Sequence, residues 1–196
     1  MSVEDRTRWD AKYAGRSVPA PDTVGPAAVF APFVDAFPAA GYALDIACGQ
    51  GAAAVWLAQR GLQVSGFDVS PVAIEQARGL AQRSGVGDRC RFDVVDLDDG
   101  LPGGPPADVV YCARFRDRRL DAPMVQRLAP GGLLAVTALS QVGATPGRFR
   151  AAPGELRTVF AGLEVIAEGE ADGMAWLLGR RRRKATAPSA HEDGRG

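Results

Sequence analysis

Two glycines and three carboxylates are spaced along the chain in a way that suits a nucleoside ligand. Gly49 and Gly51 follow Asp45 within one short turn, and Asp68 and Asp96 come at the ends of the next two apolar segments. A glycine lets backbone N–H groups approach a ligand closely because it has no Cβ, and the start of a helix favours such contacts. A carboxylate about 20 residues beyond such a turn can accept hydrogen bonds from both ribose hydroxyls. We therefore predict a nucleoside site with Asp68 on the ribose.

The segments around these residues predict two consecutive strand–helix units. Residues 42–47 form an apolar strand that runs into the Gly turn, and the small residues of 52–59 continue as a helix. Residues 62–67 alternate as a strand, after which Ser70 and Pro71 supply a helix cap and a first-turn proline. Parallel sheets bind ligands at the carboxyl ends of their strands, so both units present their candidate residues at one edge.

The remaining segments extend the same sheet. Three more strands are predicted at residues 90–94, 108–112 and 133–138. Residues 163–168 and 174–178 then form two strands with a short, turn-rich link, which requires them to be antiparallel. We predict one α/β domain, a Rossmann-like, doubly wound and mostly parallel sheet of seven strands with a reversed strand near the C-terminus.

The chain of 196 residues divides into a core and two flanking segments. Residues 42–179 are predicted to form the core domain. Residues 1–41 form an N-terminal helical cap followed by a packing helix over residues 27–37. Residues 180–196 begin with the basic run Arg180 to Lys184 and continue as a tail with few apolar residues, which we expect to be disordered.

Composition argues against several classes of partner. The 23 basic and 23 acidic residues give a net charge of zero, so the whole chain has no general attraction to nucleic acid or to an anionic membrane. The three cysteines form no CxxC pair, which predicts neither a disulfide framework nor a metal site and suits a reducing compartment. No signal peptide and no apolar stretch of about 20 residues is evident, so we expect a cytoplasmic protein.

The Gly turn alone leaves two other functions open. Residues 49–54 also satisfy the GxGxxA form of a dinucleotide fingerprint, as in an NAD-dependent oxidoreductase. Asp45 argues against a dinucleotide site because it would repel a pyrophosphate, and Asp96 adds a second acid. A zwitterionic amino-acid ligand tolerates Asp45 far better. A non-catalytic protein that binds a cofactor for regulation is the third interpretation, since fold alone does not fix function.

From Trp9 to Arg180 the chain resembles the class I S-adenosylmethionine-dependent methyltransferases. Within that family, the segment from Trp9 to Tyr13, the short chain and residues 153–156 most resemble small bacterial tellurite-resistance-type enzymes that methylate small molecules. The matching motifs are residues 43–51 (Ala-Leu-Asp-Ile-Ala-Cys-Gly-Gln-Gly), the ribose acid Asp68, the adenine-side pair Asp96-Leu97, and residues 129–133 (Ala-Pro-Gly-Gly-Leu) before the fifth strand.

The resemblance implies S-adenosylmethionine as the cofactor and a small-molecule methyl acceptor. Methyl transfer would be an in-line displacement, which gains chiefly from alignment and exclusion of water because the cofactor supplies the activated methyl group. The residues expected to contact the cofactor are Asp45, Ala47, Gly49, Gly51, Asp68, Val69, Asp96, Leu97 and Cys112.

Four residues are candidates for the substrate side of the site. Trp9 and Tyr13 lie four apart on one helical face and either cover the cofactor or anchor the first helix. Arg114 and Arg116 follow the fourth strand and either select a carboxylate or oxyanion or belong to a solvated charged face. No catalytic base is identified, because the single histidine, His191, lies in the predicted tail. A soft nucleophile such as a thiol, selenide or telluride needs none.

Overall fold

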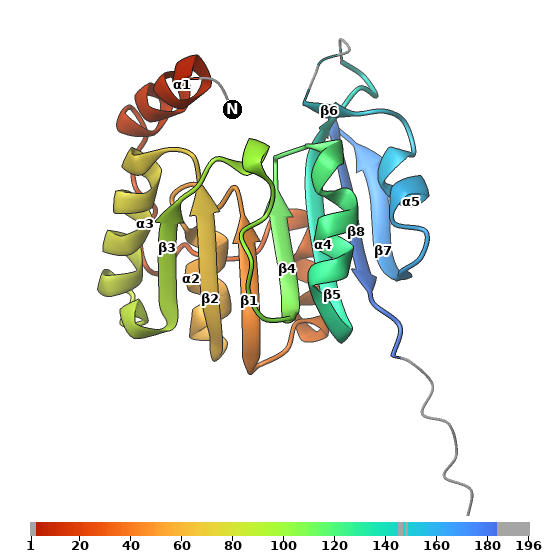
Figure 1. Cartoon of the computed structure of the whole chain (residues 1–196), viewed down its shortest axis with the longest axis horizontal. Coiled ribbons are helices and arrows are strands. Elements are labelled where there is room, and N and C mark those ends of the chain that lie inside the picture. The colour runs from red at the N-terminus through yellow and green to blue at the C-terminus, as the bar shows by residue number, and fades with distance from the viewer. Residues whose placement is uncertain (1–2, 145–146, 148, 184–196) are drawn as a thin grey trace, which may run out of the picture.

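The strands form one sheet whose order changes direction beside its central strand (Figure 1). The computed structural model describes residues 3–144, 147 and 149–183. The strands are β1 Gly41–Ile46, β2 Leu62–Asp68, β3 Cys90–Val94, β4 Ala107–Ala113, β5 Leu128–Ser140, β6 Arg150–Ala151, β7 Glu164–Ala171 and β8 Met174–Arg180. Their order is β3-β2-β1-β4-β5-β8-β7, with β6 paired to the end of β5. Strand β8 runs antiparallel to β5 and β7. The predicted fold and its reversed strand are confirmed, with β6 as a short eighth strand.

Helices flank this sheet on both faces and at the edge where its parallel strands end. The α-helices are α1 Val3–Ala14, α2 Ala52–Gln59, α3 Pro71–Arg83, α4 Asp121–Arg127 and α5 Glu155–Val159, and the 3₁₀ helices are η1 Ala28–Ala36, η2 Gly87–Arg89, η3 Leu97–Asp99 and η4 Arg118–Leu120. The predicted start of α3 is confirmed: Pro71 is its first residue, and the Ser70 hydroxyl accepts a hydrogen bond from the Ala73 N–H at 3.1 Å. Such a cap satisfies one of the N–H groups that a helix leaves free at its start.

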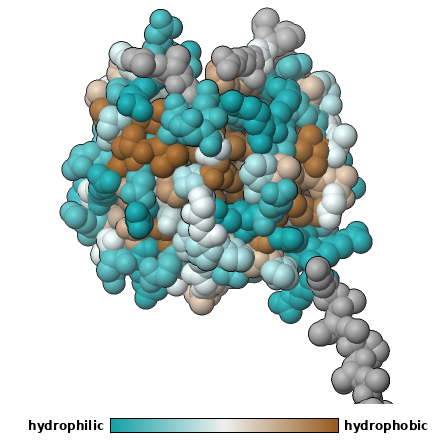
Figure 2. All heavy atoms as spheres, viewed as in Figure 1, coloured by the Kyte–Doolittle hydropathy of each residue, from teal (hydrophilic) through white to brown (hydrophobic). Residues whose placement is uncertain are grey.

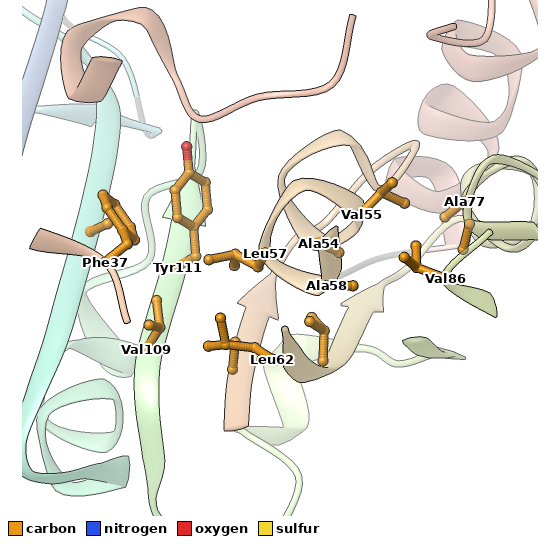
Figure 3. Close-up of a cluster of buried hydrophobic side chains, with 14 of the residues drawn as sticks. Phe37, Ala54, Val55, Leu57, Ala58, Leu62, Ala77, Val86, Val109 and Tyr111 are labelled. Atoms are coloured by element: carbon orange, nitrogen blue, oxygen red, sulfur yellow. The ribbon is translucent and has the colours of Figure 1, made fainter. Parts of the chain in front are cut away.

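Alternation along the central strands divides the core into two apolar clusters. In β4, Val109 and Tyr111 belong to one cluster and Val110 and Cys112 to the other. The first cluster packs against α2, α3 and η1, and the second against α4 and α5. Figure 3 shows the first cluster, in which the Tyr111 hydroxyl is directed away from the apolar side chains. Burial on both faces explains why these strands are apolar throughout.

Three segments differ from the sequence predictions. Residues 27–37 do not form a continuous α-helix but the 3₁₀ helix η1, which is kinked at Phe33 (φ −117°) and contains Pro32. Proline has no N–H to donate and clashes with the preceding turn, so the α-helical pattern is interrupted. Helix α4 was not predicted. Strand β5 begins at Leu128, and therefore includes the Pro130-Gly131-Gly132 segment that we placed before the fifth strand, although its pairing with β4 shifts register there.

The start of the basic run is fastened to the core. The Arg180 guanidinium donates to the carbonyl of Gly131 at 3.0 Å and to that of Ala36 at 3.1 Å. The next residue, Arg181, donates to the carbonyls of Gln126 and Leu128. Lys184 and the tail predicted to be disordered lie outside the described residues. Among the helices that are described, none is long and apolar enough to cross a membrane.

Candidate functional site

A cavity of about 1050 Å³ lies at the carboxyl ends of β1, β2, β4 and β5. Helix α1 and strand β6 both stand beyond this edge of the sheet, on opposite sides of it (Figure 1). Strand order changes direction between β1 and β4, which is where open α/β sheets bind their ligands. The sequence prediction of a ligand site at this edge therefore has a cavity to match it.

The Gly turn after β1 uses its two glycines differently. Gly49 lines the cavity at φ 53°, and a Cβ there would lie 2.8 Å from the Tyr13 hydroxyl. Gly51 has φ 79° and begins α2, but a Cβ there would lie 2.8 Å from the Cβ of Ala77 on α3. Both positions need glycine, because a side chain would be strained in this backbone conformation. Gly49 gives ligand access to the turn, whereas Gly51 allows α2 and α3 to pack closely.

Asp45 lines the cavity from the end of β1 and is almost fully buried. Its Oδ2 atom has no hydrogen-bond partner among the described residues. Burial raises the pKa of this carboxyl to about 8, and the Asp68 carboxylate also raises it, while a hydrogen bond from the Ala54 backbone acts in the opposite direction. A buried acceptor without a donor is costly, so this atom is ready to receive a hydrogen bond from a ligand.

Asp68 lies at the end of β2 and also lines the cavity. Its Oδ2 accepts a hydrogen bond from the Gly49 N–H at 2.9 Å, and its Oδ1 accepts one from the Ser70 N–H at 2.9 Å. Burial raises the pKa of Asp68, and these backbone donors partly oppose the shift. A carboxylate oxygen can accept more than one hydrogen bond, so Asp68 can hold the Gly turn and still receive ligand hydroxyls.

The structure brings most, but not all, of the predicted cofactor residues to the cavity. Ala47, Val69 and Leu97 line it together with the residues above. Asp96 does not belong to the lining, and its Oδ1 accepts a hydrogen bond from the Asp98 N–H at 2.9 Å at the start of η3. Cys112 is buried behind the lining. Asp96, Gly51 and Cys112 thus do not line the cavity, and their predicted contacts with a cofactor remain predictions.

Helix α1 places Trp9 and Tyr13 over the Gly turn. Their rings stack at 5.8 Å and both line the cavity. Two hydrogen bonds fasten α1 to α3: the Ser70 hydroxyl donates to Asp10 at 2.5 Å, and the Gln76 amide donates to the Tyr13 carbonyl at 3.1 Å. Burial, followed by the charge of Asp68, raises the pKa of the Tyr13 hydroxyl, which therefore keeps its proton at neutral pH.

The two arginines predicted on the substrate side lie in different environments. Arg114 is exposed and lines the cavity. Arg116 is almost fully buried outside that lining, where its guanidinium binds Asp121 at 2.5 and 2.8 Å and Glu155 at 2.6 and 2.8 Å. Arg116 therefore occupies neither the substrate side nor a solvated face, and it joins β4 to α4 and α5.

Several cavity residues were not identified from the sequence. Tyr111 is buried among apolar side chains, and its hydroxyl accepts a hydrogen bond from the Ala27 N–H at 2.7 Å, which orders the segment before η1. Lys12 and Arg16 join the lining from α1 and the residues after it. The helical spacing of Lys12 and Arg16, four residues apart beside Trp9 and Tyr13, was the available signal for these two cations.

We define two walls of the cavity by their residues. The strand-end wall consists of Asp45, Ala47, Gly49, Asp68 and Val69. The basic wall consists of the cations Lys12, Arg16, Arg114 and Arg150, with Asp172 and the apolar Leu139, Met174 and Trp176 beside them. On the face in Figure 2, hydrophilic side chains prevail along the edge where the strands end.

Comparison with known proteins identifies the domain. Residues 43–132 match the family model described as "Methyltransferase domain". A 2-heptyl-1-hydroxyquinolin-4(1H)-one methyltransferase of Mycobacteroides abscessus is 41% identical over 59 residues, which are 30% of this chain and 26% of that protein. A ribosomal RNA small subunit methyltransferase C of Alcanivorax borkumensis is 34% identical over 107 residues, which are 50% of this chain and 32% of that protein.

Solved structures agree with the fold. A structure reported under "Conversion of a Disulfide Bond into a Thioacetal Group during Echinomycin Biosynthesis" aligns with a TM-score of 0.64 and 25% identity, covering 92% of this chain and 94% of its own. TehB from Haemophilus influenzae aligns with a TM-score of 0.63 and 18% identity, covering 72% and 57%. The chain spans only about a third or less of the length of the two curated relatives named above. Residues 43–132 thus match a methyltransferase domain, and the chain has the fold of S-adenosylmethionine-dependent methyltransferases, a fold that TehB shares.

Proposed function

We propose that this protein transfers a methyl group from S-adenosylmethionine to a small-molecule acceptor. The observation that carries the proposal is the strand-end wall, where the buried Asp45 Oδ2 has no partner among the described residues and lies in the same cavity as Gly49 and Asp68. Ligand cavities commonly measure roughly 300–1,000 Å³, so a cavity of about 1050 Å³ has room for a cofactor and an acceptor together.

The residues of the strand-end wall fit the chemistry of the cofactor. Asp45 can accept a hydrogen bond from its amino group, and ionisation of Asp45 beside a cation is favourable because opposite charges stabilise each other. Gly49 leaves the turn open, and Asp68 can accept from the ribose hydroxyls. When bound, S-adenosylmethionine supplies a methyl group on a positively charged sulfur, which makes that group open to attack by a nucleophile of the acceptor.

The chain's own contribution is then to align the acceptor and exclude water. Trp9 and Tyr13 cover the Gly turn from α1, which limits access of solvent to this part of the cavity. Tyr13 keeps its proton at neutral pH, so it is a hydrogen-bond donor and not a general base. This favours an acceptor that ionises easily or is already nucleophilic, such as a thiol.

The proposed compartment is the reducing cytoplasm. All three cysteines of the chain are free; Cys112 is buried and the other two are half-buried, which supports a role in packing.

Calorimetry tests the proposed function directly. We expect S-adenosylhomocysteine to bind with a Kd of micromolar or lower and NAD not to bind, because a pyrophosphate would be repelled by Asp45. Incubation with labelled S-adenosylmethionine and a panel of thiols, phenols, carboxylic acids and chalcogen oxyanions then identifies methylated products. Tighter binding of NAD than of S-adenosylhomocysteine would contradict the proposal, and methylation of ribosomal RNA or protein alone would exclude the small-molecule acceptor.

A further inference from the structure

The segment after β4 carries several arginines, and one of them differs from the rest. Arg116 binds Asp121 and Glu155, Arg118 binds Glu155, and Arg119 binds Asp117 and Asp98. Arg114 has no ion pair with any described residue, although it lies in the same stretch of chain. The arginines outside the cavity lining thus have acidic partners, whereas the one that lines the cavity has none among the described residues.

The backbone holds Arg114 in an unusual conformation. Its φ is 56°, in the left-handed region that residues other than glycine rarely adopt. The Arg114 N–H donates to the Thr137 carbonyl at 2.9 Å and to the Thr137 hydroxyl at 3.0 Å, and Thr137 is itself buried on β5. Strained positions of this kind persist where the surrounding structure fixes them, and they are common at ligand sites. The base of Arg114 is therefore fixed while its side chain stays available.

Other cations surround the same space. Burial lowers the pKa of Lys12, and the positive charges of Arg16, Arg8 and Arg114 lower it further. Arg150 pairs with Leu139 at the end of β5 and completes the basic wall. Asp172 is the carboxylate of that wall, so four cations face one acid. Like charges repel one another, and an anion bound among these cations would reduce that repulsion.

Apolar side chains lie beside these cations. Leu139, Met174 and Trp176 line the cavity between β5 and β8, while Asp45 and Asp68 belong to the strand-end wall. A ligand of this part of the cavity would thus meet an apolar surface and a positive one together. A guanidinium fork matches the geometry of a carboxylate or phosphate.

We propose that the methyl acceptor is an organic anion, an apolar body with a carboxylate or phosphate group, and that Arg114 binds this group. The inference rests on the proposed function for its identification of the ligand as the acceptor. Because the anionic group sets the orientation of the acceptor, Arg114 determines which acceptors the site takes. The residues of the strand-end wall hold the cofactor.

The test uses the full-length protein saturated with S-adenosylhomocysteine. Aryl and alkyl carboxylates and phosphate monoesters are titrated by calorimetry, each beside its neutral amide or alcohol. We expect at least one anion to bind ten-fold or more tightly than its neutral counterpart, and the carboxylate and phosphate series show which group is preferred. Arg114→Gln should abolish that preference, and Arg114→Lys should restore part of it.

Arg119→Gln is the matched control, since it removes the same charge from the same segment outside the cavity lining. It should leave the anion preference unchanged, and all variants should bind S-adenosylhomocysteine within two-fold of the parent. The inference is overturned if no anion is preferred, if both variants lose the preference equally, or if an RNA oligonucleotide displaces the anions. It is also overturned if Arg114→Gln weakens the binding of S-adenosylhomocysteine but not the binding of methylthioadenosine. In that case Arg114 would bind the carboxylate of the cofactor.

The two proposals can fail separately. Failure of S-adenosylhomocysteine to bind the parent protein would contradict the proposed function, and the anion series would then be titrated into the protein alone. Binding of S-adenosylhomocysteine without an anion preference would contradict only the inference about Arg114.

Discussion

The strand-end wall and the basic wall of the cavity are built in different ways. On the strand-end wall, backbone geometry fixes each group: Asp68 accepts hydrogen bonds from the N–H groups of Gly49 and Ser70, and Gly49 itself lies at a positive φ. On the basic wall, long side chains from α1, β6 and the segment after β4 line the cavity, and Arg114 among them has no ion pair with a described residue. The wall built on backbone suits a ligand common to a whole family, and the wall built on side chains can change with the acceptor.

The largest effect that we predict concerns the support behind the basic wall. Arg116→Gln removes the cation between Asp121 and Glu155 and leaves two largely buried carboxylates without it. Removing one partner of a buried ion pair commonly costs about 3–5 kcal/mol, so the free energy of unfolding should fall by that amount. Denaturant titration measures the change. Arg119→Gln, at an exposed ion pair, should change it by less than about 1 kcal/mol, and equal losses would contradict the distinction.

A second substitution tests whether the two glycines of the Gly turn differ. Gly51→Ala should lower the free energy of unfolding by roughly 2–5 kcal/mol, because the new Cβ meets Ala77 in a left-handed backbone. Gly49→Ala should cost less, roughly 1–2 kcal/mol, because its Cβ meets the hydroxyl at the end of the Tyr13 side chain, which can move. Thermal and denaturant unfolding of both variants make the comparison. A larger loss for Gly49→Ala would reverse our assignment.

Asp68 holds the Gly turn and is the proposed acceptor for the ribose hydroxyls, so its removal should affect both binding and stability. Asp68→Ala should weaken the binding of S-adenosylhomocysteine by about 10-fold to several hundred-fold, because each charged hydrogen bond that is lost contributes roughly 1.5–3 kcal/mol. The structure adds that the N–H groups of Gly49 and Ser70 lose their acceptor, so the melting temperature should also fall.

Asp68→Asn is the control for this prediction. One oxygen remains, but the amide NH₂ must face one of the two backbone N–H donors, so binding should be intermediate and stability should still decrease. Parent-like affinity in a folded Asp68→Ala protein, measured by calorimetry and circular dichroism, would contradict the ribose assignment.

The last effect that we predict is a gradual pH dependence set by Asp45, spread over several pH units. Its pKa rises from 3.8 to about 8 on folding, so the folded chain binds one more proton than the unfolded chain between these values. The stability that this proton contributes is fully present below about pH 4 and is lost as the pH rises through about 8. One proton changes the free energy of unfolding by at most about 1.4 kcal/mol per pH unit. Asp45→Asn should remove this slope from urea titrations, and a parent-like slope in that variant would contradict it.

The same contrast between the walls explains what the sequence could predict. The strand ends, helix α2 and the cap at Ser70 depend on short local patterns, namely apolar runs, glycines and a Ser-Pro pair. The predicted positions of Asp45, Gly49 and Asp68 at one cavity followed from these patterns, because the carboxyl ends of parallel strands meet at one edge.

Features that depend on distant partners were not predictable in this way. Whether an arginine after β4 lines a cavity or lies in a buried ion pair depends on Glu155, which is 39 residues away from Arg116. The same applies to the Tyr111 hydroxyl, whose donor is Ala27, 84 residues away. The prediction of an α-helix over residues 27–37 was wrong for a local reason instead. The helical spacing of the hydrophobic residues was given more weight than Pro32, which interrupts an α-helix.

The position of β8 between β5 and β7 has a consequence for how the chain folds. Strand β5 pairs along seven residues with β8, which is synthesised some 35 residues later, so one edge of β5 stays open until the C-terminal hairpin arrives. The Arg180 side chain then binds the Ala36 carbonyl, 144 residues earlier in the sequence. Contacts at such long separation slow folding, and an open strand edge invites association with other chains. The nascent protein is therefore most vulnerable to aggregation after β5 has been made and before β8 has left the ribosome.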